Sequence, residues 1–177
     1  MIETTSEIHN IDFDSWDSFV KTHPKSTVFQ SPEMYEVFIK SKNFEPVLIT
    51  AKQDGKLAGL ILAVIIREYS GLHGFFSSRT VIYGGPLIDE AHPNYADILE
   101  SLLTLLIKEV KNRTIFIQFR NFYEFSQDRI AIYNQFGFKF MDRLNYLVDT
   151  SSETVVKKRI SKSKLRQVKK GLETGAE

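Results

Sequence analysis

Apolar residues recur at helical spacing in two short segments before residue 44. Asp12 or Asp14 can cap a first helix that runs through Thr22 and ends at His23. Its predicted apolar face consists of Trp16, Phe19 and Val20. Residues 8–11 (IHNI) predict a short strand before this helix.

A second amphipathic helix is predicted after Ser31. Ser31 followed by Pro32 is a typical helix start, because serine caps the first turn and proline suits the first helical position. The apolar stripe of this helix consists of Met34, Val37 and Phe38.

Longer apolar runs with the character of strands follow. Residues 46–53 and 56–69 are joined by Asp54 and Gly55, a strong short-range signal for a hairpin. The second run is apolar from residue 57 to residue 66, as expected of a strand that is covered on both faces. Gly71 and Gly74 then predict a loop.

Residues 79–88 (RTVIYGGPLI) predict a central strand that is interrupted by a bend. Gly84 and Gly85 lack Cβ atoms, so they permit unusual backbone angles and the close approach of another molecule. Pro86 donates no backbone hydrogen bond and stops the ladder. The bend is therefore a candidate ligand contact, and the alternative is an ordinary tight turn that leaves the sheet.

The rest of the chain alternates helices and strands. Helices are predicted over residues 95–111 and 125–136, and strands over residues 114–119 and 139–148. The order β-α-α-β-β-β-α-β-α-β predicts a mixed α/β protein. This order resembles the GNAT-like (acyl-CoA N-acyltransferase-like) fold, a mixed sheet flanked by helices. In that fold the acyl donor lies where the sheet parts after its fourth strand, the position of the strand with the bend.

The composition is that of an ordinary globular protein. With 177 residues, 42% of them hydrophobic and 25% charged, the chain is long enough for one domain with a sizeable core. The absence of cysteine excludes disulfides, thiolate metal sites and a cysteine nucleophile. No secretory signal pattern is visible, and the longest apolar run is shorter than the roughly 20 residues of a membrane-spanning helix. A cytoplasmic location is predicted.

Several common chemistries lack their sequence signatures. The four histidines have no partner at metal-binding spacing, so no metal site is predicted. Neither a nucleophilic-serine motif nor the phosphate loop of ATP and GTP enzymes occurs. CoA enzymes of the GNAT fold resemble R/Q-x-x-G-x-G/A after the fourth strand, a run whose N–H groups hold pyrophosphate. Residues 84–87 do not fit this pattern because Pro86 removes a donor, and no cofactor is predicted.

Seven segments form a series along almost the whole chain. They are residues 27–31 (TVFQS), 44–46 (FEP), 83–89 (YGGPLID), 117–121 (IQFRN), 136–138 (FGF), 144–149 (LNYLVD), and 160–163 (ISKS) running into 166–171 (RQVKKG). In this order they resemble the FemAB family, peptidoglycan-bridge aminoacyltransferases built from two GNAT-like halves. The resemblance implies transfer of an amino acid from aminoacyl-tRNA to an amine of a cell-wall precursor, without a metal or nucleotide cofactor.

The resemblance also implies a domain arrangement. Residues 1–150 correspond to the GNAT-like N-terminal domain of a FemAB-like protein, and residues 151–177 to a basic helical segment that leads toward a missing second GNAT-like half. The implied partners are aminoacyl-tRNA, bound by the full-length protein, a cell-wall precursor and the missing C-terminal half. No catalytic residue is assigned to this half, and the fragment alone is expected to be inactive.

The candidate substrate-binding residues gather at two strand ends. Tyr83, Gly84 and Gly85 belong to the bend. Arg120 and Asn121 follow a strand, where arginine can grip a phosphate or carboxylate and asparagine can position it. Charge toward the same anion can come from two lysines near the end of the second helix, Lys40 and Lys42. The alternatives are a surface salt bridge for the arginine and a solvated surface for the lysines.

Basic residues are concentrated at the C-terminal end. The net charge is +1, yet residues 157–177 carry eight basic and two acidic side chains. The predicted nucleic-acid-binding residues are Lys157, Lys158, Arg159, Lys162, Lys164, Arg166, Lys169 and Lys170. Ser163 can cap a helix whose apolar side consists of Leu165, Val168 and Leu172. Docking on the missing half is favoured, with RNA or peripheral contact with an anionic membrane as alternatives.

Two other functions remain open at this stage. One is an N-acyltransferase of the same fold that uses acyl-CoA or acyl-carrier protein. The other is a non-catalytic substrate-binding module. Binding of an acyl-CoA donor would favour the first, and binding of an acceptor without a donor would favour the second.

Overall fold

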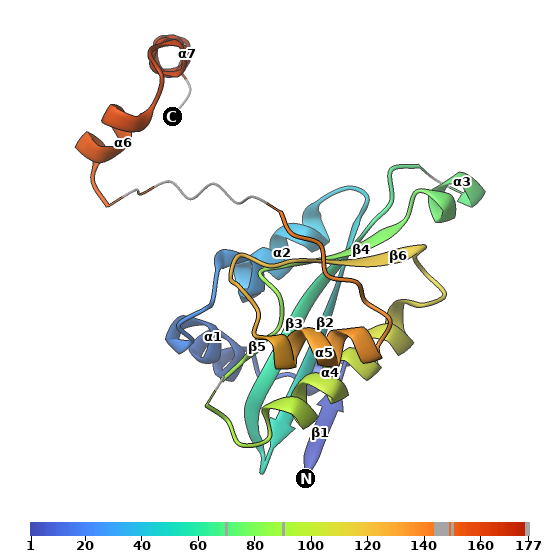
Figure 1. Ribbon diagram of the computed structural model, residues 1–177. Helices are drawn as coiled ribbons and strands as arrows, with labels where there is room; N and C mark the ends of the chain where they lie inside the picture. The colour runs from blue at the N-terminus through green and yellow to red at the C-terminus, as the bar shows by residue number, and fades with distance from the viewer. Residues whose placement is uncertain (70, 90, 144–148, 150, 176–177) are drawn as a thin grey trace. The chain divides into compact units, whose positions relative to one another are not determined.

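The computed structural model describes residues 1–69, 71–89, 91–143, 149 and 151–175 (Figure 1). Contacts divide the chain into two compact units, Met1–Phe140 and Met141–Glu177. Each unit is described by itself.

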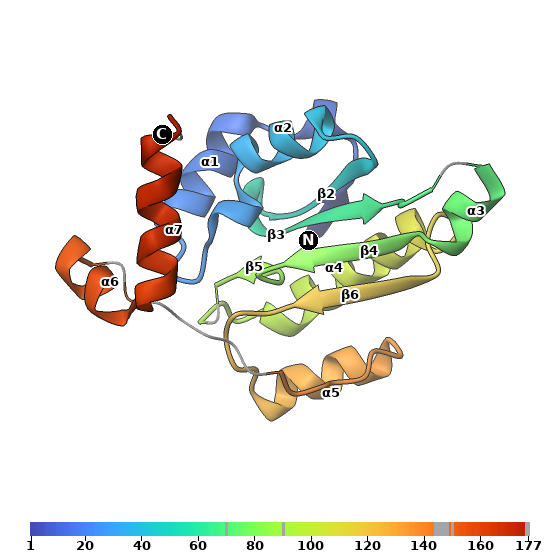
Figure 2. The ribbon, with the colours of Figure 1, turned by 90° about the horizontal axis from the view of Figure 1, so that it is seen from above.

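Six strands of the first unit, all within the described ranges, form one mixed sheet (Figure 2). They are β1 (Ile2–Thr5), β2 (Phe44–Gln53), β3 (Lys56–Ile66), β4 (Arg79–Tyr83), β5 (Leu87–Ile88) and β6 (Phe116–Arg120). The order is β1-β2-β3-β4-β6, and β5 pairs with β3 beyond the end of β4. Neighbouring strands are antiparallel except β4 and β6, which are parallel. The sheet therefore changes from antiparallel to parallel pairing at β4.

The predicted hairpin forms at Asp54 and Gly55. Both residues have positive φ, 52° and 76°, as a two-residue turn between twisted strands requires. Beyond the turn, alternate β3 residues enter two hydrophobic clusters, so that Ile61 lies in one cluster and Leu62 in the other. Because both faces of β3 are covered, its continuous apolar sequence is explained and the prediction is confirmed.

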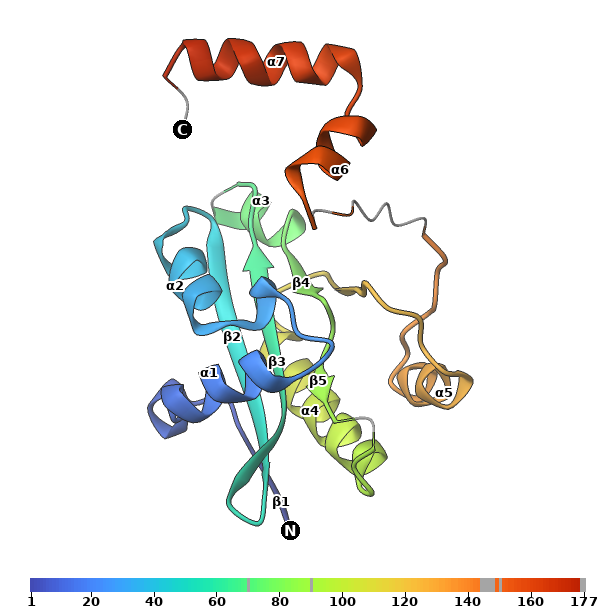
Figure 3. The same cartoon turned by 90° about the vertical axis from the view of Figure 1, so that its left-hand side faces the viewer.

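Helices cover both faces of the sheet (Figure 3). The cluster on one face includes residues of α1 (Phe13–Thr22) and α2 (Pro32–Lys40). The cluster on the other face includes residues of α4 (Tyr95–Val110) and α5 (Gln127–Gln135). The remaining helical segments of this unit are the 3₁₀ turns η1 (Ile8–Asn10) and η2 (Val28–Gln30) and the short helix α3 (Gly71–Phe76).

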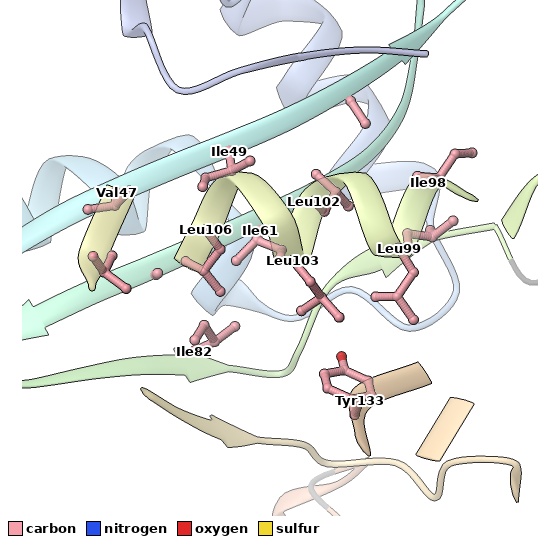
Figure 4. Packing of buried hydrophobic residues seen from close by; sticks show 14 of the residues in the cluster. Val47, Ile49, Ile61, Ile82, Ile98, Leu99, Leu102, Leu103, Leu106 and Tyr133 are labelled. Carbon is pink, nitrogen blue, oxygen red and sulfur yellow. The ribbon is translucent and has the colours of Figure 1, made fainter. Parts of the chain in front are cut away.

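The apolar side of α4 forms the centre of the larger cluster (Figure 4). Its buried residues are Ile98, Leu99, Leu102, Leu103, Leu106 and Val110. They pack against Val47, Ile49, Ile61 and Ile82 of the strands. Full burial of each such side chain stabilises the fold by about 1.5–3 kcal/mol before the entropy cost, so α4 and the sheet are expected to form one cooperative core.

Several predicted elements differ in the structure. The first strand is β1 rather than residues 8–11, which form η1. The sequence pattern did not predict β1, because β1 is an edge strand of mostly polar, partly exposed residues. Residues 71–76 form α3 rather than a loop, and Ser77 N closes it on His73 O. Val37 is exposed, because Tyr35 rather than Val37 packs beside Trp16.

The predicted last strand of this unit is also different. Residues 139–143 have no regular secondary structure, and residues 144–148 of that prediction lie outside the described residues. Residues 139–141 are exposed, so the alternation of apolar and polar side chains there does not mark a buried strand face.

The second unit contains α6 (Glu153–Arg159) and α7 (Lys162–Glu173). Ser152 caps α6 by accepting a hydrogen bond from Val155 N. Ser161, rather than the predicted Ser163, caps α7 by accepting one from Lys164 N. Neither helix has a buried residue. No helix in the described ranges combines the length and apolar character needed to span a membrane.

Candidate ligand-binding site

The bend between β4 and β5 is a large bulge in the ladder. β4 pairs with β3 up to Ala63 opposite Ile82, and pairing resumes at Leu60 opposite Leu87. Four residues, Tyr83 to Pro86, therefore stand opposite two residues of β3. Gly84 and Gly85 have φ of 80° and 73°, in the left-handed region that side chains with a Cβ rarely adopt. The glycines are thus required by the backbone.

Gln30 holds the bend in place. Its side chain is fully buried, and Nε2 donates to Tyr83 O at 3.1 Å and to Gly85 O at 3.4 Å. Oε1 accepts from Thr27 N and Thr27 Oγ1 at 2.8 and 2.7 Å. A Cβ on Gly84 would overlap Gln30 Nε2. One amide side chain therefore connects the η2 capping box with both sides of the bend.

Trp16 fixes the position of Gln30 in turn. The Trp16 indole is fully buried and donates from Nε1 to Gln30 O at 2.8 Å. Because Trp16 belongs to α1, the position of α1 on the sheet constrains the bend through the hydrogen bonds of Trp16 and Gln30.

The end of β6 lies against the other side of the bend. Gly84 N donates to Arg120 O at 2.8 Å, and a Cβ on Gly85 would overlap Asn121 Oδ1. The Arg120 guanidinium lies 5.3 Å from the centre of the Tyr83 ring, which also stacks on Phe29. The structure therefore brings together five of the predicted substrate-binding residues, Tyr83, Gly84, Gly85, Arg120 and Asn121.

The two predicted lysines lie elsewhere. Lys40 ends α2, is exposed, and pairs with Glu36 at 3.4 Å. Lys42 is exposed just before β2. The first residue of β2 pairs with Ile66, and Ile66 in turn pairs with the first residue of β4. The bend follows the other end of β4, about 15 Å away at roughly 3.3 Å per residue. The structure does not bring these lysines to the bend.

A small pocket opens beside the bend. Its lining includes Gly84, Pro86, Asn121, His23, Tyr95 and Tyr123. A larger open groove of about 610 Å³ lies between α1 and the β2–β3 hairpin. We place the candidate site at the bend and its small pocket, because strand ends and the loops that follow them are usual ligand sites in α/β sheets.

The loop before α4 is closed by its own hydrogen bonds, while the side chain of Asn94 makes no capping hydrogen bond to the helix. Ala91 N donates to Asp89 Oδ1 at 3.0 Å, and Asn94 N donates to His92 Nδ1 at 3.2 Å. His92 N and Tyr95 N donate to backbone oxygens of the same loop. Asp97 adds a negative charge in the first turn. An anion at this helix start would approach the carboxylate of Asp97 in the first turn.

A buried phenol lies near the same strands. Tyr133 of α5 contacts Phe119, Phe125 and Phe138, and no described residue hydrogen-bonds its hydroxyl. Burial raises the pKa of the Tyr133 phenol well above its ordinary value. This residue therefore stays uncharged at any physiological pH.

All eight predicted nucleic-acid-binding residues are exposed on two helices. Lys157, Lys158 and Arg159 form the last turn of α6, and the other five, Lys162, Lys164, Arg166, Lys169 and Lys170, lie on α7. Val168 and Leu172 of the apolar side of α7 are 51% and 63% exposed. The second unit thus presents a basic, amphipathic helical surface.

Comparison with known proteins identifies the fold but no sequence family. Neither a protein-family model nor a curated protein matches the chain. A solved transcriptional regulator from Bacillus halodurans C-125 is 17% identical with a TM-score of 0.54, covering 83% of this chain and 99% of its own. The ribosomal-protein-alanine N-acetyltransferase from Brucella melitensis biovar Abortus 2308 is 12% identical with a TM-score of 0.53, covering 84% and 99%. The chain has the GNAT fold.

FemX is a further structural neighbour with the GNAT fold. It is 20% identical with a TM-score of 0.62, and the match covers 77% of this chain. The chain spans about a third of FemX, 32% of its length. The predicted α/β, GNAT-like architecture is therefore confirmed, while the relationship to the FemAB family stays a prediction.

Three residues of this GNAT-fold site were not singled out from the sequence. Gln30 had a signal, because Thr27 and Gln30 have capping-box spacing. Trp16 was assigned only to the core. Tyr133 had no local signal, since its environment is created by β6 and the segment after α5.

Proposed function

We propose that this chain is the N-terminal half of a FemAB-like aminoacyltransferase and that it holds the acceptor. The complete enzyme transfers an amino acid from aminoacyl-tRNA to an amine of a peptidoglycan precursor or a related cell-envelope amine. The GNAT fold and the similarity to a third of FemX support this proposal. In this arrangement a second GNAT-like half supplies most of the donor site, and the protein works in the cytoplasm.

The observation that carries the proposal is the negative charge at the start of α4 together with Pro86 in the bend. A pyrophosphate group requires free N–H donors at a helix start, and a positive local field assists it. In the loop before α4 the N–H groups of Ala91 and Asn94 are already used, and Asp89 in that loop and Asp97 in the first turn add negative charge. Pro86 supplies no donor in the bend. These features disfavour acyl-CoA as the ligand of this half.

The bend offers a different set of contacts to an acceptor. The missing Cβ atoms of Gly84 and Gly85 make room for the side chains of Gln30 and Asn121, and Gln30 keeps that backbone in one conformation beside the small pocket. The guanidinium of Arg120 is exposed and can pair with a phosphate or carboxylate, while its contact with the Tyr83 ring orients it. These residues bind and position; none of them is assigned a proton transfer.

The test is titration calorimetry of residues 1–177 with UDP-N-acetylmuramoyl-pentapeptide and, separately, with acetyl-CoA. The proposal predicts saturable binding of the precursor and none of acetyl-CoA. Arg120→Gln should weaken binding of the precursor about tenfold, the value of one charge-assisted hydrogen bond. The matched Arg143→Gln variant should bind like wild type. A weaker affinity of Lys40→Ala or Lys42→Ala for the precursor would show that the ligand extends toward the second helix.

A second candidate is an N-acyltransferase that uses acyl-CoA or acyl-carrier protein. It is favoured by one observation, that this chain covers 99% of the length of solved structures named acetyltransferases. Acetyl-CoA binding in the same titration would support this candidate and contradict the first. Precursor binding by a full-length protein that never transfers an amino acid would indicate a binding module.

The proposal also predicts that residues 1–177 fold but do not turn over. The two clusters of the first unit already form a complete core, whereas the donor site belongs to the second half. Purified protein with charged tRNA and precursor should give no aminoacylated product. Turnover by this chain alone would contradict the assignment to an acceptor-holding half.

A further inference from the structure

His23 carries a hydrogen-bond donor that no described residue accepts. It follows α1, and its Nδ1 accepts from Lys25 N at 3.1 Å. Since Nδ1 accepts this hydrogen bond, the N–H donor of the imidazole is on Nε2. That nitrogen is buried, and none of the described residues is bonded to it.

The same imidazole lines the small pocket beside the bend. His23 reaches this pocket from the connection between α1 and α2, and Gly84 and Pro86 reach it from the connection between β4 and β5. Two segments that are about sixty residues apart in sequence therefore form one pocket. Its volume of about 20 Å³ admits a single small group, such as one water or one oxygen atom of a ligand.

A buried N–H without a partner is rare, because its desolvation is not offset. The fold could have avoided this by exposing Nε2, as α1 ends at the surface. Instead the contact with Lys25 N holds the ring so that Nε2 is buried and the residue contributes to the lining of the pocket. The walls around it combine aromatic side chains such as Tyr95 and Phe125 with the cationic residues Lys25 and Arg129, so the missing partner is an oxygen acceptor that suits a pocket with positive charge.

We propose that His23 donates a hydrogen bond from Nε2 to a peptide oxygen of the acceptor, an amide carbonyl or a terminal carboxylate, seated beside Gly84 and Pro86. His23 is then a specificity-determining residue that selects ligands with a peptide portion. This inference rests on the proposed acceptor-holding role of the chain. It adds a recognition element that is separate from the Arg120 contact with an anion.

The direct test is NMR of the ¹⁵N-histidine-labelled full chain. The His23 ring should show the Nε2–H form. Titration with N-acetyl-alanyl-alanine and with its carboxamide should move the Hε2 signal and slow its exchange with water. A response to both probes identifies a carbonyl, and a response to the free acid alone identifies a carboxylate. Exchange that stays unaffected by both probes would show that only water occupies the site and would overturn the inference.

Variants separate the hydrogen bond from the shape of the ring. His23→Phe keeps an aromatic ring but removes both the Nε2 donor and the acceptor of Lys25 N, so it should lose about tenfold in affinity for the responsive probe. His23→Gln retains an N–H in a similar place and should stay within about threefold of wild type. Equal probe affinity of His23→Phe and wild type would overturn the inference.

His92 provides the matched control. Its Nδ1 also accepts from the backbone N–H two residues later, at 3.2 Å, but its ring does not line this pocket. His92→Phe should leave probe binding unchanged. If UDP-N-acetylmuramoyl-pentapeptide binds equally to wild type and to His23→Phe, the role of His23 fails and the proposed function stands. If the dipeptide probes engage His23 but the precursor does not bind, the proposed function fails and the site stands.

Discussion

The glycine bend and the basic tail are both candidate binding regions, but they are built in opposite ways. Gly84 and Gly85 are fixed by buried contacts with Gln30 and Asn121. The eight cations of residues 157–170 lie on two helices without a buried residue. In the bend, close packing requires glycine at both positions. In the tail, the total positive charge rather than any single side chain is expected to determine binding.

This difference predicts two kinds of response to mutation. A single change in the bend should have a large effect on stability, because packing is specific and neighbouring contacts fail together. Single changes in the tail should have small, nearly additive effects that depend on salt. The predictions below test this contrast.

The largest effect is expected for Gly84→Ala. The added Cβ meets Gln30 Nε2 in a left-handed backbone, so backbone strain of about 1–2 kcal/mol adds to the loss of buried hydrogen bonds worth about 1–3 kcal/mol. We expect the free energy of unfolding to fall by about 3–5 kcal/mol in urea denaturation.

Gly137→Ala is the control for this prediction. Gly137 has the same φ of 80°, but nothing lies within 4 Å of a Cβ built there. It should lose only the strain, about 1–2 kcal/mol. Equal losses for the two variants would show that Gln30 does not constrain the bend. The related variant Gly85→Val should lose roughly 1–3 kcal/mol or block ligand binding.

The tail should dominate binding to polyanions. If RNA is the partner, contacts from about six cations give a slope of log K against log salt near −4, since each contact with a single strand contributes roughly −0.7. Fluorescence titration with a generic tRNA at several salt concentrations measures this slope. Deletion of residues 157–177 should flatten it.

The matched tail variant removes the apolar side and keeps the charges. Replacement of Leu165, Val168 and Leu172 by alanine should leave the slope unchanged if RNA contacts are electrostatic. Equal affinity and slope for intact and tail-deleted protein would remove the tail from RNA binding and favour docking on a second protein half.

Gln30→Leu should be the next largest effect on stability. Leucine fills a similar volume but leaves Tyr83 O, Gly85 O and Thr27 N without their side-chain partner, which costs about 2–3 kcal/mol. Gln167→Leu places the same substitution on the exposed surface of α7 and should change stability by less than about 0.5 kcal/mol. Thermal and urea unfolding of both variants compare the regions directly. Similar losses at the two positions would contradict the contrast.

The smallest effect concerns Glu45 and acid. Burial would raise the pKa of Glu45, but hydrogen bonds and charge from Arg67 and Arg113 hold it below its ordinary value of 4.5. A lowered folded-state pKa means that this pairing stabilises the protein above the unfolded-state pKa, and the stabilisation is lost as pH falls through the folded-state pKa.

Because Glu45 is nearly half exposed, solvent screening limits the effect to less than about 1 kcal/mol. Glu45→Gln should be less stable than wild type at neutral pH and equally stable at pH 2. The measurement is urea unfolding across this pH range. A constant difference at all pH values would show that packing, not charge, accounts for the loss.

Local signals predicted the parts of the fold that local interactions decide. Asp54 and Gly55 set the hairpin through their own backbone angles, and the periodic leucines of α4 mark its buried face. β1 was missed because an edge strand needs little apolar sequence, and its pairing with β2 decides its structure.

The candidate site divides in the same way. Gly84, Gly85, Arg120 and Asn121 could be proposed because glycine pairs and strand ends are local features. The role of Gln30 could not, since its partners Tyr83 and Gly85 are more than fifty residues away in sequence. The donor of His23 likewise has meaning only once α1 and the bend are placed side by side.

We propose that the bend, and not the start of α4, is the ligand site of this GNAT fold. Amide chemical-shift mapping of residues 1–177 tests it most directly, with UDP-N-acetylmuramoyl-pentapeptide and acetyl-CoA added separately. We expect the precursor to shift the signals of Gly84, Gly85 and Asn121 and acetyl-CoA to shift none near Ala91 to Asp97. Shifts at Ala91 to Asp97 on addition of acetyl-CoA, with none at the bend from the precursor, would contradict it.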